Sequence, residues 1–371
     1  MPETVKKIAL LGPAPPFRGG ISQFALMLGR EFLHRGHEVK MFTFKRQYPK
    51  LLFPGGEQTT SFSGLEGISV QRVFTPYLPQ SWRYAVSEIR VWKPDLLIVS
   101  YFLPWFAPSY TWILKKLADI RIVCLAHNID FHEKWPGADL LSKRLFARCH
   151  SIVLLSEACK RDLQRKMPKH IADKGISGFH PIYDCYADNH ASREKPSQPT
   201  ALFFGLIKPY KGLDVLLAAT KQALKAMPDL KLIIAGEVYG SSEQYLQMIR
   251  RLGLTEVVET HFRYIGEDEI GQLFQRSQVC VLPYKSATQS GVISTSYNFN
   301  VPVIASDVGG LSEYISPGET GLLVPPGNPE ALAQAMIRYF KDGMYLSMSS
   351  NIPAYKEQYS WQKLADIFLQ A

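Results

Sequence analysis

Backbone amides in the second half of the sequence have the arrangement of a phosphate site. Residues 289–292 have the composition of a loop that opens a short helix. A buried strand is expected at residues 302–305, and a glycine loop at residues 307–313 comes directly after it. Free N–H groups at a helix start and in a glycine loop bind phosphate without a metal or a basic side chain. The two loops therefore predict an anion site.

Two lysines follow the first strand expected in the second half of the chain. Residues 203–213 predict a strand, a turn at Gly205, the lysines Lys208 and Lys211, and then a helix. Two ammonium groups in such a place would neutralise the charge that grows on a departing diphosphate. The alternative is a pair of solvated lysines on an ordinary turn, and the position directly after a strand favours the phosphate interpretation.

Two places in the first half could also do chemistry. The long loop at residues 12–21 ends in Gly19 and Gly20, which would let a ligand approach the start of the next helix. His127 follows the strand expected at residues 122–126, where a neutral imidazole can donate a hydrogen bond to a hydroxyl or transfer a proton. The alternatives are an ordinary turn for the glycines and a carbonyl cap for His127.

His132 and Glu133 lie close after His127, and the role of His132 is left open. No further histidine has the spacing that a metal site would need, so no metal is predicted. The five cysteines are odd in number and contain no Cys-x-x-Cys pair, which argues against a disulfide framework or a zinc site and fits a reducing cytoplasm.

Strand-length apolar runs alternate with helical patterns in two series, separated by a polar stretch at residues 188–199 that we interpret as a linker. This alternation predicts an α/β fold of two doubly wound, Rossmann-like parallel-sheet domains that face each other across a cleft. We place the domains at residues 1–187 and 200–354, with the helical end at residues 355–371 as a candidate to pack back on the first. Ligands of such sheets bind beyond the carboxyl ends of the strands.

Charge is distributed unevenly along the 371 residues, whose formal net charge is +9. The chain has 28 Lys and Arg against 17 Asp and Glu through Lys195, which leaves 14 against 16 beyond it. A basic first half suggests that only this half meets an anionic partner. The uncharged residues 96–114 are interrupted by Pro104 and Pro108 and predict a strand, a loop and a helix rather than a membrane span. The N-terminus leads directly into a strand pattern, so no signal peptide is expected.

The ordered set of motifs resembles the family 4 glycosyltransferases, which share the two-domain GT-B architecture. The matching pieces include the Gly19-Gly20 loop, His127-Asn128, Ser156-Glu157, the segment from Gly205 to Gly212, Ala235-Gly236-Glu237, and residues 302–313. The resemblance implies a nucleotide-diphosphate sugar as donor, retention of anomeric configuration, and no bound metal or other cofactor. It also implies that Lys208 and Lys211 hold the diphosphate and that His127 touches the donor sugar.

The same resemblance implies further donor-binding positions, with Tyr264 and Ile265 near the nucleobase. These positions are Gly205, Glu237, Tyr264, Ile265, Gln289, Ser290, Gly291, Val292 and Glu313. Lys208 stands where the family usually has arginine, which keeps the charge but loses bidentate binding. A larger departure is that Ala287 and Thr295 occupy the positions of two glutamates typical of the family, so recognition of the ribose and sugar must differ.

Exposed aromatic side chains beside basic helices would suit an anionic membrane surface. Trp105, Phe106, Tyr110 and Trp112 are the candidates, and a buried aromatic core is the alternative. No nucleic-acid module is recognisable, so nucleic acid is not expected as a partner.

The sequence thus predicts a retaining glycosyltransferase that is peripheral on the cytoplasmic face of the plasma membrane. Its substrates would be a nucleotide sugar and a glycan or polyprenol-linked acceptor of surface-polysaccharide synthesis. A nucleotide-sugar epimerase and a catalytically silent nucleotide-sugar-binding protein are the alternatives.

Overall fold

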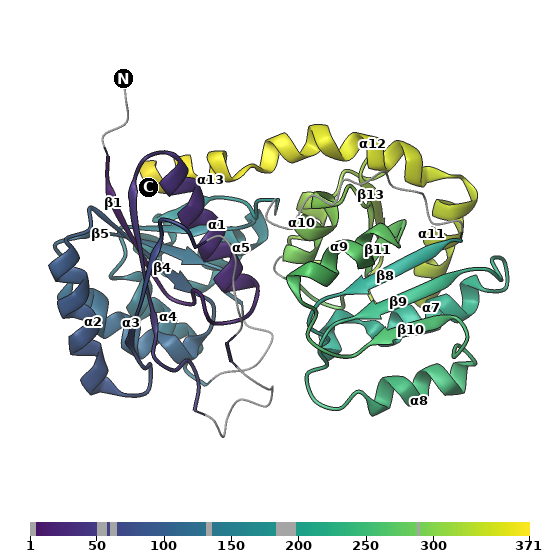
Figure 1. Ribbon diagram of the computed structural model, residues 1–371, viewed down its shortest axis with the longest axis horizontal. Helices are drawn as coiled ribbons and strands as arrows, with labels where there is room; N and C mark the ends of the chain where they lie inside the picture. The colour runs from purple at the N-terminus through teal and green to yellow at the C-terminus, as the bar shows by residue number, and fades with distance from the viewer. Residues whose placement is uncertain (1–4, 50–57, 60–64, 131–135, 183–197, 288–289) are drawn as a thin grey trace. The chain divides into compact units, whose positions relative to one another are not determined.

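The structure, a computed structural model, describes residues 5–49, 58–59, 65–130, 136–182, 198–287 and 290–371. The chain divides into two compact units (Figure 1). Unit 1 consists of residues 1–179 and 361–371, and unit 2 consists of residues 180–360. Most of the stretch interpreted as a linker lies outside the described residues.

The sheet of unit 1 has seven parallel strands in the order β3-β2-β1-β4-β5-β6-β7. The strands are β1 (Lys7–Leu11), β2 (Glu38–Phe44), β3 (Ser69–Phe74), β4 (Leu96–Tyr101), β5 (Arg121–Ala126), β6 (Ser151–Leu154) and β7 (Gly175–Ser177). All six residues of β4 are buried, as expected for a central parallel strand that is covered on both faces.

Helices cover both faces of this sheet. One face packs against α2 (Pro79–Trp92), the short η2 (Pro104–Phe106), α3 (Ala107–Lys116), α4 (Ala138–Phe146), α5 (Glu157–Lys166) and α6 (Lys169–Ala172). Phe42 and Phe44 of β2 point into this layer. The alternate residue Met41 points to the other face, where it meets Gly29 of α1 (Gly20–His34). The helices of unit 1 thus form two layers, one on each face of the sheet, as the alternation of strands and helices predicted.

The last helix, α13 (Trp361–Gln370), belongs to unit 1 and packs against α1. Arg35 at the end of α1 donates to Asp366 Oδ1 at 2.5 Å and to the Gln362 carbonyl at 2.6 Å. The Trp361 ring contacts Phe24 at 5.0 Å between centroids. The buried apolar face of α13 therefore completes the core on the side of the sheet that α1 covers.

The uncharged residues 96–114 form β4, η2 and most of α3. Phe106 and Tyr110 are fully buried, so the core alternative holds for these two aromatics. Trp105 and Trp112 are half-buried and pack on the edge of the core. Among the described residues, no helix has both the length and the apolar character to cross a membrane.

The sheet of unit 2 has six parallel strands in the order β10-β9-β8-β11-β12-β13. The strands are β8 (Thr200–Phe204), β9 (Lys231–Ala235), β10 (Val258–His261), β11 (Val279–Leu282), β12 (Val303–Ser306) and β13 (Gly321–Val324). The helices are η3 (Pro209–Lys211), α7 (Leu213–Ala223), α8 (Glu243–Leu252), α9 (Glu267–Gln275), α10 (Gly291–Asn298), η4 (Ser312–Tyr314), α11 (Pro329–Lys341), α12 (Met344–Lys356) and η5 (Glu357–Tyr359). The sheet, α7, α8 and α11 share one buried cluster.

In both sheets the first strand lies in the middle. The next two strands run to one edge, and the remaining strands start again beside the first strand and run to the other edge. The direction changes between β1 and β4 in unit 1 and between β8 and β11 in unit 2. Loops that leave two such neighbouring strands diverge and leave a crevice at the carboxyl edge, where doubly wound sheets bind ligands. Each unit therefore has its own ligand edge.

Candidate active site

The ligand edge of unit 2 brings together the loops after β8 and β11. The first loop carries Gly205, Lys208 and Lys211 and enters α7, and the second leads to Ser290 and α10. The Lys285 N–H donates to the Tyr210 carbonyl at 2.7 Å, which joins the loops directly. Two stretches that lie far apart in sequence thus form one surface.

Glycine is required in these loops because other backbone atoms occupy the space of a side chain. A Cβ on Gly212 would lie 2.0 Å from the Pro283 carbonyl oxygen, and a Cβ on Gly236 would lie 2.1 Å from that of Gly205. Gly205, Gly212 and Gly236 also have φ values of +100°, +70° and +152°, which L side chains rarely adopt. The loops after β8, β9 and β11 are therefore held in close backbone contact.

Lys211 brings its ammonium group beside the first turn of α10. A Cβ on Gly205 would lie 3.5 Å from Lys211 Nζ and 3.2 Å from Val292 Cγ2, so both groups border this glycine. Lys211 Nζ also lies 5.1 Å from the centroid of the Tyr284 ring, a cation–π contact. Burial lowers the pKa of Lys211. A cation with little water around it interacts more strongly with an anionic ligand than an exposed one does.

Lys208 has a different environment. Its ammonium lies 4.7 Å from the centroid of the half-exposed Tyr239 ring. The Ile207 N–H donates to the Glu237 carbonyl at 2.8 Å, so the loops after β8 and β9 continue the strand pairing beyond the sheet. The structure therefore places Lys208 and Glu237 on adjoining loops, with Lys208 on the more open side.

The start of α10 is capped by Ser290, whose Oγ accepts a hydrogen bond from the Val292 N–H at 3.3 Å. Ser290 Oγ also lies 3.3 Å from the Tyr284 hydroxyl. A short helix thus begins within residues 289–292, as predicted, and the amide of Val292 already has a partner within its own turn. Gln289 lies outside the described residues.

Thr295, at one position of the typical glutamates, is buried and donates from Oγ1 to the Gly291 carbonyl of its own helix at 3.1 Å. Its hydroxyl is therefore used within α10. Glu313 lies in η4, and its carbonyl accepts hydrogen bonds from Tyr359 at 3.3 Å and from Tyr355 at 3.5 Å. Tyr264 and Ile265 follow β10, the first exposed and the second buried.

In unit 1, His127 follows β5 and is buried. Its backbone N–H donates to the Tyr101 carbonyl at 2.8 Å, and its ring contacts Phe24 edge-on at 5.3 Å between centroids. Gly19 and Gly20 lie at the start of α1, and Gly19 has a φ of +115°. α1 and β5 thus fix the candidate residues of this unit, while His132 and Glu133 lie outside the described residues.

Two family models match the two units separately. A model described as Glycosyltransferase Family 4 matches residues 18–173, and a model described as Glycosyl transferases group 1 matches residues 198–342.

The chain belongs to the glycosyltransferases.

Relatives that are similar to this chain in sequence are also named as glycosyltransferases. The D-inositol 3-phosphate glycosyltransferase of Paenarthrobacter aurescens is 32% identical over 48% of this chain, which spans 44% of that relative. The enzyme of the same name from Corynebacterium aurimucosum is 24% identical over 94% of this chain and 89% of its own length.

Solved structures show the same fold. The Anabaena protein HepE in complex with UDP-glucose is 18% identical, covers 98% of both chains and has a TM-score of 0.76. Sucrose-phosphate synthase of Thermosynechococcus elongatus is 20% identical, covers 98% of both chains and has a TM-score of 0.75. The predicted GT-B fold with two doubly wound domains is confirmed.

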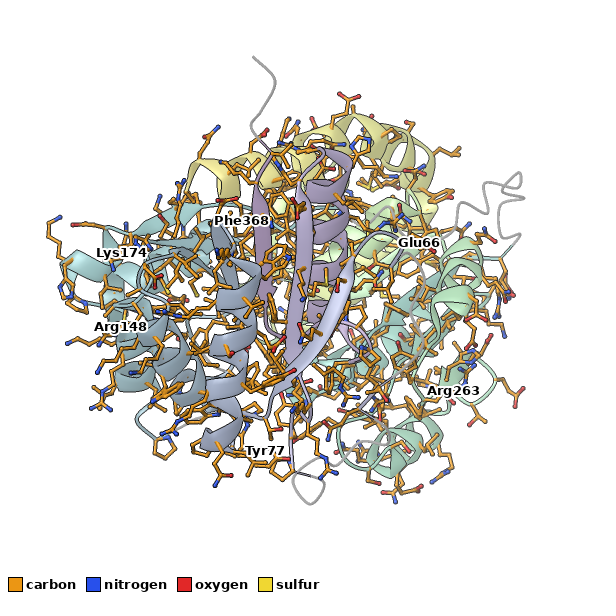
Figure 2. The ribbon with its side chains drawn as sticks, turned by 60° about the vertical axis from the view of Figure 1, so that its left-hand side comes forward. Glu66, Tyr77, Arg148, Lys174, Arg263 and Phe368 are labelled. Carbon is orange, nitrogen blue, oxygen red and sulfur yellow. The ribbon has the colours of Figure 1, made fainter. Side chains whose placement is uncertain are left out.

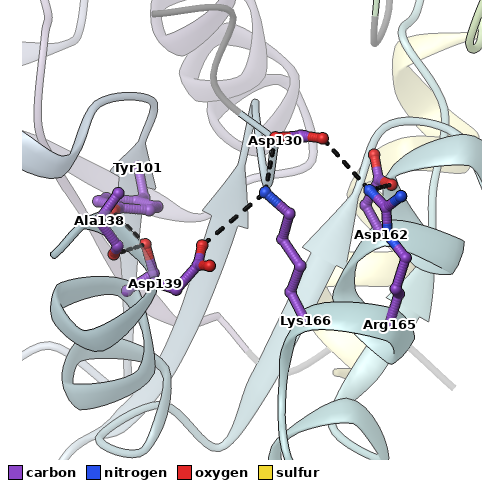
Figure 3. A network of polar contacts seen from close by, with 8 residues as sticks. Tyr101, Asp130, Ala138, Asp139, Asp162, Arg165 and Lys166 are labelled. Atoms are coloured by element: carbon purple, nitrogen blue, oxygen red, sulfur yellow. Dashed lines mark hydrogen bonds and ion pairs between the residues drawn. The ribbon is translucent and has the colours of Figure 1, made fainter. Parts of the chain in front are cut away.

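An ion-pair network at the ligand edge of this glycosyltransferase's unit 1 was missed by the sequence analysis (Figure 3). Lys166 Nζ of α5 lies 2.6 Å from Asp130 and 3.8 Å from Asp139. Arg165 adds contacts to Asp130 at 3.2 Å and to Asp162 at 2.7 Å. Burial alone would raise the pKa of Asp130, but the Lys166 ammonium reverses the shift and lowers it. The network fixes the chain three residues after His127. Arg165 and Lys166 are 35 and 36 positions from Asp130, so spacing gave no signal.

A buried histidine in unit 2 was also missed. His180 Nδ1 lies 3.1 Å from Ser294 Oγ of α10, and its backbone N–H donates to the Tyr314 hydroxyl at 2.7 Å. Burial lowers its pKa to about 4. His180 is therefore a neutral group that packs against α10 and η4.

A cavity of about 770 Å³ lies at the opposite, amino edge of the unit 2 sheet, with Thr200, Lys231 and Arg276 in its lining. It contains none of the candidate residues. We assign the site to the carboxyl edge, where the loops diverge. Within the described residues, no three His, Cys, Asp or Glu side chains gather as metal ligands would.

Proposed function

We propose that this glycosyltransferase moves a sugar from a nucleoside-diphosphate donor to a hydroxyl of a glycan or lipid-linked saccharide, with retention of anomeric configuration. The observation that carries this proposal is that Lys211 and the first turn of α10 both lie beside Gly205. A cation and a helix N-terminus at one point suit a diphosphate. The complex of HepE with UDP-glucose supports the same donor class.

Unit 2 would stabilise the leaving group. As the bond from the anomeric carbon to the diphosphate oxygen breaks, its electron pair passes to the diphosphate. Lys211, Lys208 and the amides of Gly291 and Val292 would balance this charge, a kind of contribution that typically accounts for about 10²–10³ in kcat per donor. For Val292 this requires that the Ser290 side chain turns away and leaves the Val292 N–H free to donate to the phosphate.

The acceptor hydroxyl would attack the oxocarbenium-like carbon on the face that the diphosphate leaves, and its proton would pass to a departing phosphate oxygen. His127 would contact the donor sugar, and the Gly19-Gly20 loop would contact the acceptor or a phosphate. Glu237, Glu313, Tyr264 and Ile265 would complete donor binding. The reaction as proposed uses no metal ion, because ammonium and amide groups carry the electrostatic role.

A catalytically silent nucleotide-sugar binder is the second candidate, because Thr295 hydrogen-bonds its own helix where a glutamate is typical. Incubation with a panel of nucleotide sugars and glycan acceptors separates the candidates. We expect release of nucleoside diphosphate and a glycosylated product. Binding without turnover would support the silent binder, and a donor changed only in its own sugar would support an epimerase.

The cellular setting is also a proposal. We place the protein at the cytoplasmic face of the plasma membrane, in the synthesis of a surface polysaccharide. The excess of Lys and Arg in the first half supports contact with anionic lipid. Attachment through these charges should weaken with salt, so sedimentation of the protein with anionic vesicles at low and high salt tests it.

A further inference from the structure

The ligand edge of unit 1 contains a pocket of about 340 Å³ that is lined by none of the residues predicted to bind the donor or to act in catalysis. It is bordered by residues from the segments after β3, β4 and β5, and those of α2 and α4 lie in the first turns of these helices. The lining residues are Pro76, Tyr77, Pro79, Trp82, Pro104, Trp105, Pro108, Pro136 and Leu141. Its volume lies within the range of about 300–1,000 Å³ typical of pockets that bind small molecules.

The lining favours an apolar occupant. It contains no charged side chain, and five of the nine residues are prolines, which have no backbone N–H to offer. The Trp82 indole N–H donates to the Thr75 carbonyl at 3.1 Å, which uses its polar group. A sugar ring brings several hydroxyls that need hydrogen-bond partners when buried. A hydrocarbon chain needs none.

The surroundings of the pocket suit a lipid with an anionic head. Leu78 and Leu140, each next in sequence to a lining residue, are 48% and 53% exposed. Lys143 and Arg144 follow Leu140 at helical spacings of three and four, so they lie on the same face of α4 and are exposed. Apolar side chains beside cations are typical of surfaces that contact anionic lipid.

We propose that this pocket binds the hydrocarbon chain of a lipid-linked acceptor, while Lys143 and Arg144 contact the lipid phosphate. The inference rests on the proposed transfer to such an acceptor and names its carrier by chemistry, an isoprenoid or acyl chain joined to phosphate. It gives unit 1 a chain-binding site that is separate from its candidate residues His127, Gly19 and Gly20.

Calorimetric titration of the full chain with farnesyl phosphate and with inorganic phosphate tests the inference. We expect saturable binding of farnesyl phosphate at least about tenfold tighter than that of phosphate, because apolar burial adds to the charge contacts. The double variant Leu78→Asp with Leu140→Asp should weaken farnesyl phosphate binding about tenfold. Val91→Asp is the matched control, since Val91 is 76% exposed at the other end of α2, about 18 Å away.

The charge contacts have their own control. Lys143→Glu with Arg144→Glu should weaken binding of both ligands, while Arg148→Glu should not. Figure 2 shows Arg148 well separated from Tyr77 of the pocket. A diazirine analogue of farnesyl phosphate should label peptides that contain Tyr77, Trp82 or Trp105.

Several outcomes would contradict the proposal that this pocket binds a hydrocarbon chain. These are equal affinity for the two ligands, no effect of the leucine variants, labelling in unit 2, or labelling only when phosphatidylcholine vesicles are present, which would mean general adsorption to a bilayer. The proposed function is tested separately with a soluble short-chain acceptor. Turnover of that acceptor without farnesyl phosphate binding contradicts the pocket alone, and farnesyl phosphate binding without any sugar transfer contradicts the function alone.

Discussion

Units 1 and 2 share a topology but use glycine differently at their ligand edges. In unit 2, Gly212 and Gly236 lie so close to other carbonyls that a Cβ would overlap them, at 2.0 and 2.1 Å. In unit 1, a Cβ on Gly19 or Gly20 would meet no described atom within 4 Å. The edge of unit 2 is thus held by backbone contact, while that of unit 1 is open at Gly19 and Gly20 and tied by the side-chain ion pairs of Lys166. The fold supplies the edge, and the loops determine what it can bind.

Gly236→Ala should have the largest effect. A methyl group would overlap the Gly205 carbonyl in a backbone conformation of φ +152°, so we expect the free energy of unfolding to fall by more than about 4 kcal/mol. Urea denaturation measures it. Gly20→Ala is the control and should change stability by less than about 0.5 kcal/mol. Equal losses in the two variants would remove the contrast between the edges.

Lys211→Ala should follow, with a loss of about 10²–10³ in kcat for sugar transfer. Lys208→Ala should lose less, because Lys208 lies on the open side against Tyr239. Steady-state kinetics measure both, with the exposed Lys221→Ala of α7 as a control. A Lys208 variant more damaged than the Lys211 variant would reverse our assignment of the diphosphate site.

Acid should weaken unit 2 through His180. Its pKa is about 4 when folded, below the ordinary 6.5, so the unfolded chain takes up a proton that the folded chain excludes. Stability is therefore full above pH 6.5 and falls as pH decreases towards 4, by up to about 3 kcal/mol. Comparison with His180→Gln isolates this effect, since the variant should lose less stability between pH 7 and pH 4. Parallel curves for the two proteins would contradict a buried neutral His180.

Lys166→Met should have the smallest effect, because its partners Asp130 and Asp139 are about half exposed. Ion pairs of this kind contribute about 0.2–1 kcal/mol, so thermal unfolding should shift only slightly. The network also holds Asp130, three residues after His127. If it positions this segment for catalysis, Lys166→Met should lower kcat clearly although it changes the free energy of unfolding only slightly. A control at Lys169, which pairs with Asp173 away from this segment, should leave kcat unchanged.

The sequence predicted the strands of the two sheet centres, because their residues are apolar on both faces. It missed β3 (Ser69–Phe74), β7 (Gly175–Ser177) and β10 (Val258–His261), which lie at sheet edges and whose residues are mostly part-buried. It also missed α2, in which only Ala85 and Ile89 are buried. Edge elements are specified by tertiary contacts more than by their own pattern.

The candidate site was predictable where a local pattern encodes it. Ser156 caps α5 and accepts a hydrogen bond from the Cys159 N–H at 3.1 Å, as a serine directly before a helix commonly does. The helix expected to follow the loop at residues 289–292 is also present. The bond of Thr295 to its own helix was not predictable, since a threonine hydroxyl has several possible partners in a helix. Nor were Asp130 and Lys166, which only the fold brings together.

The position of α13 in unit 1 has a consequence for the order in which the protein is made. The ribosome synthesises all of unit 2, residues 180–360, before it reaches the helix that packs against α1. Until then Phe24 lacks its contact with Trp361, and Arg35 has Glu31 of its own helix but lacks Asp366. The unit that begins first therefore finishes folding last, and its uncovered apolar face is a surface on which a chaperone would act during translation.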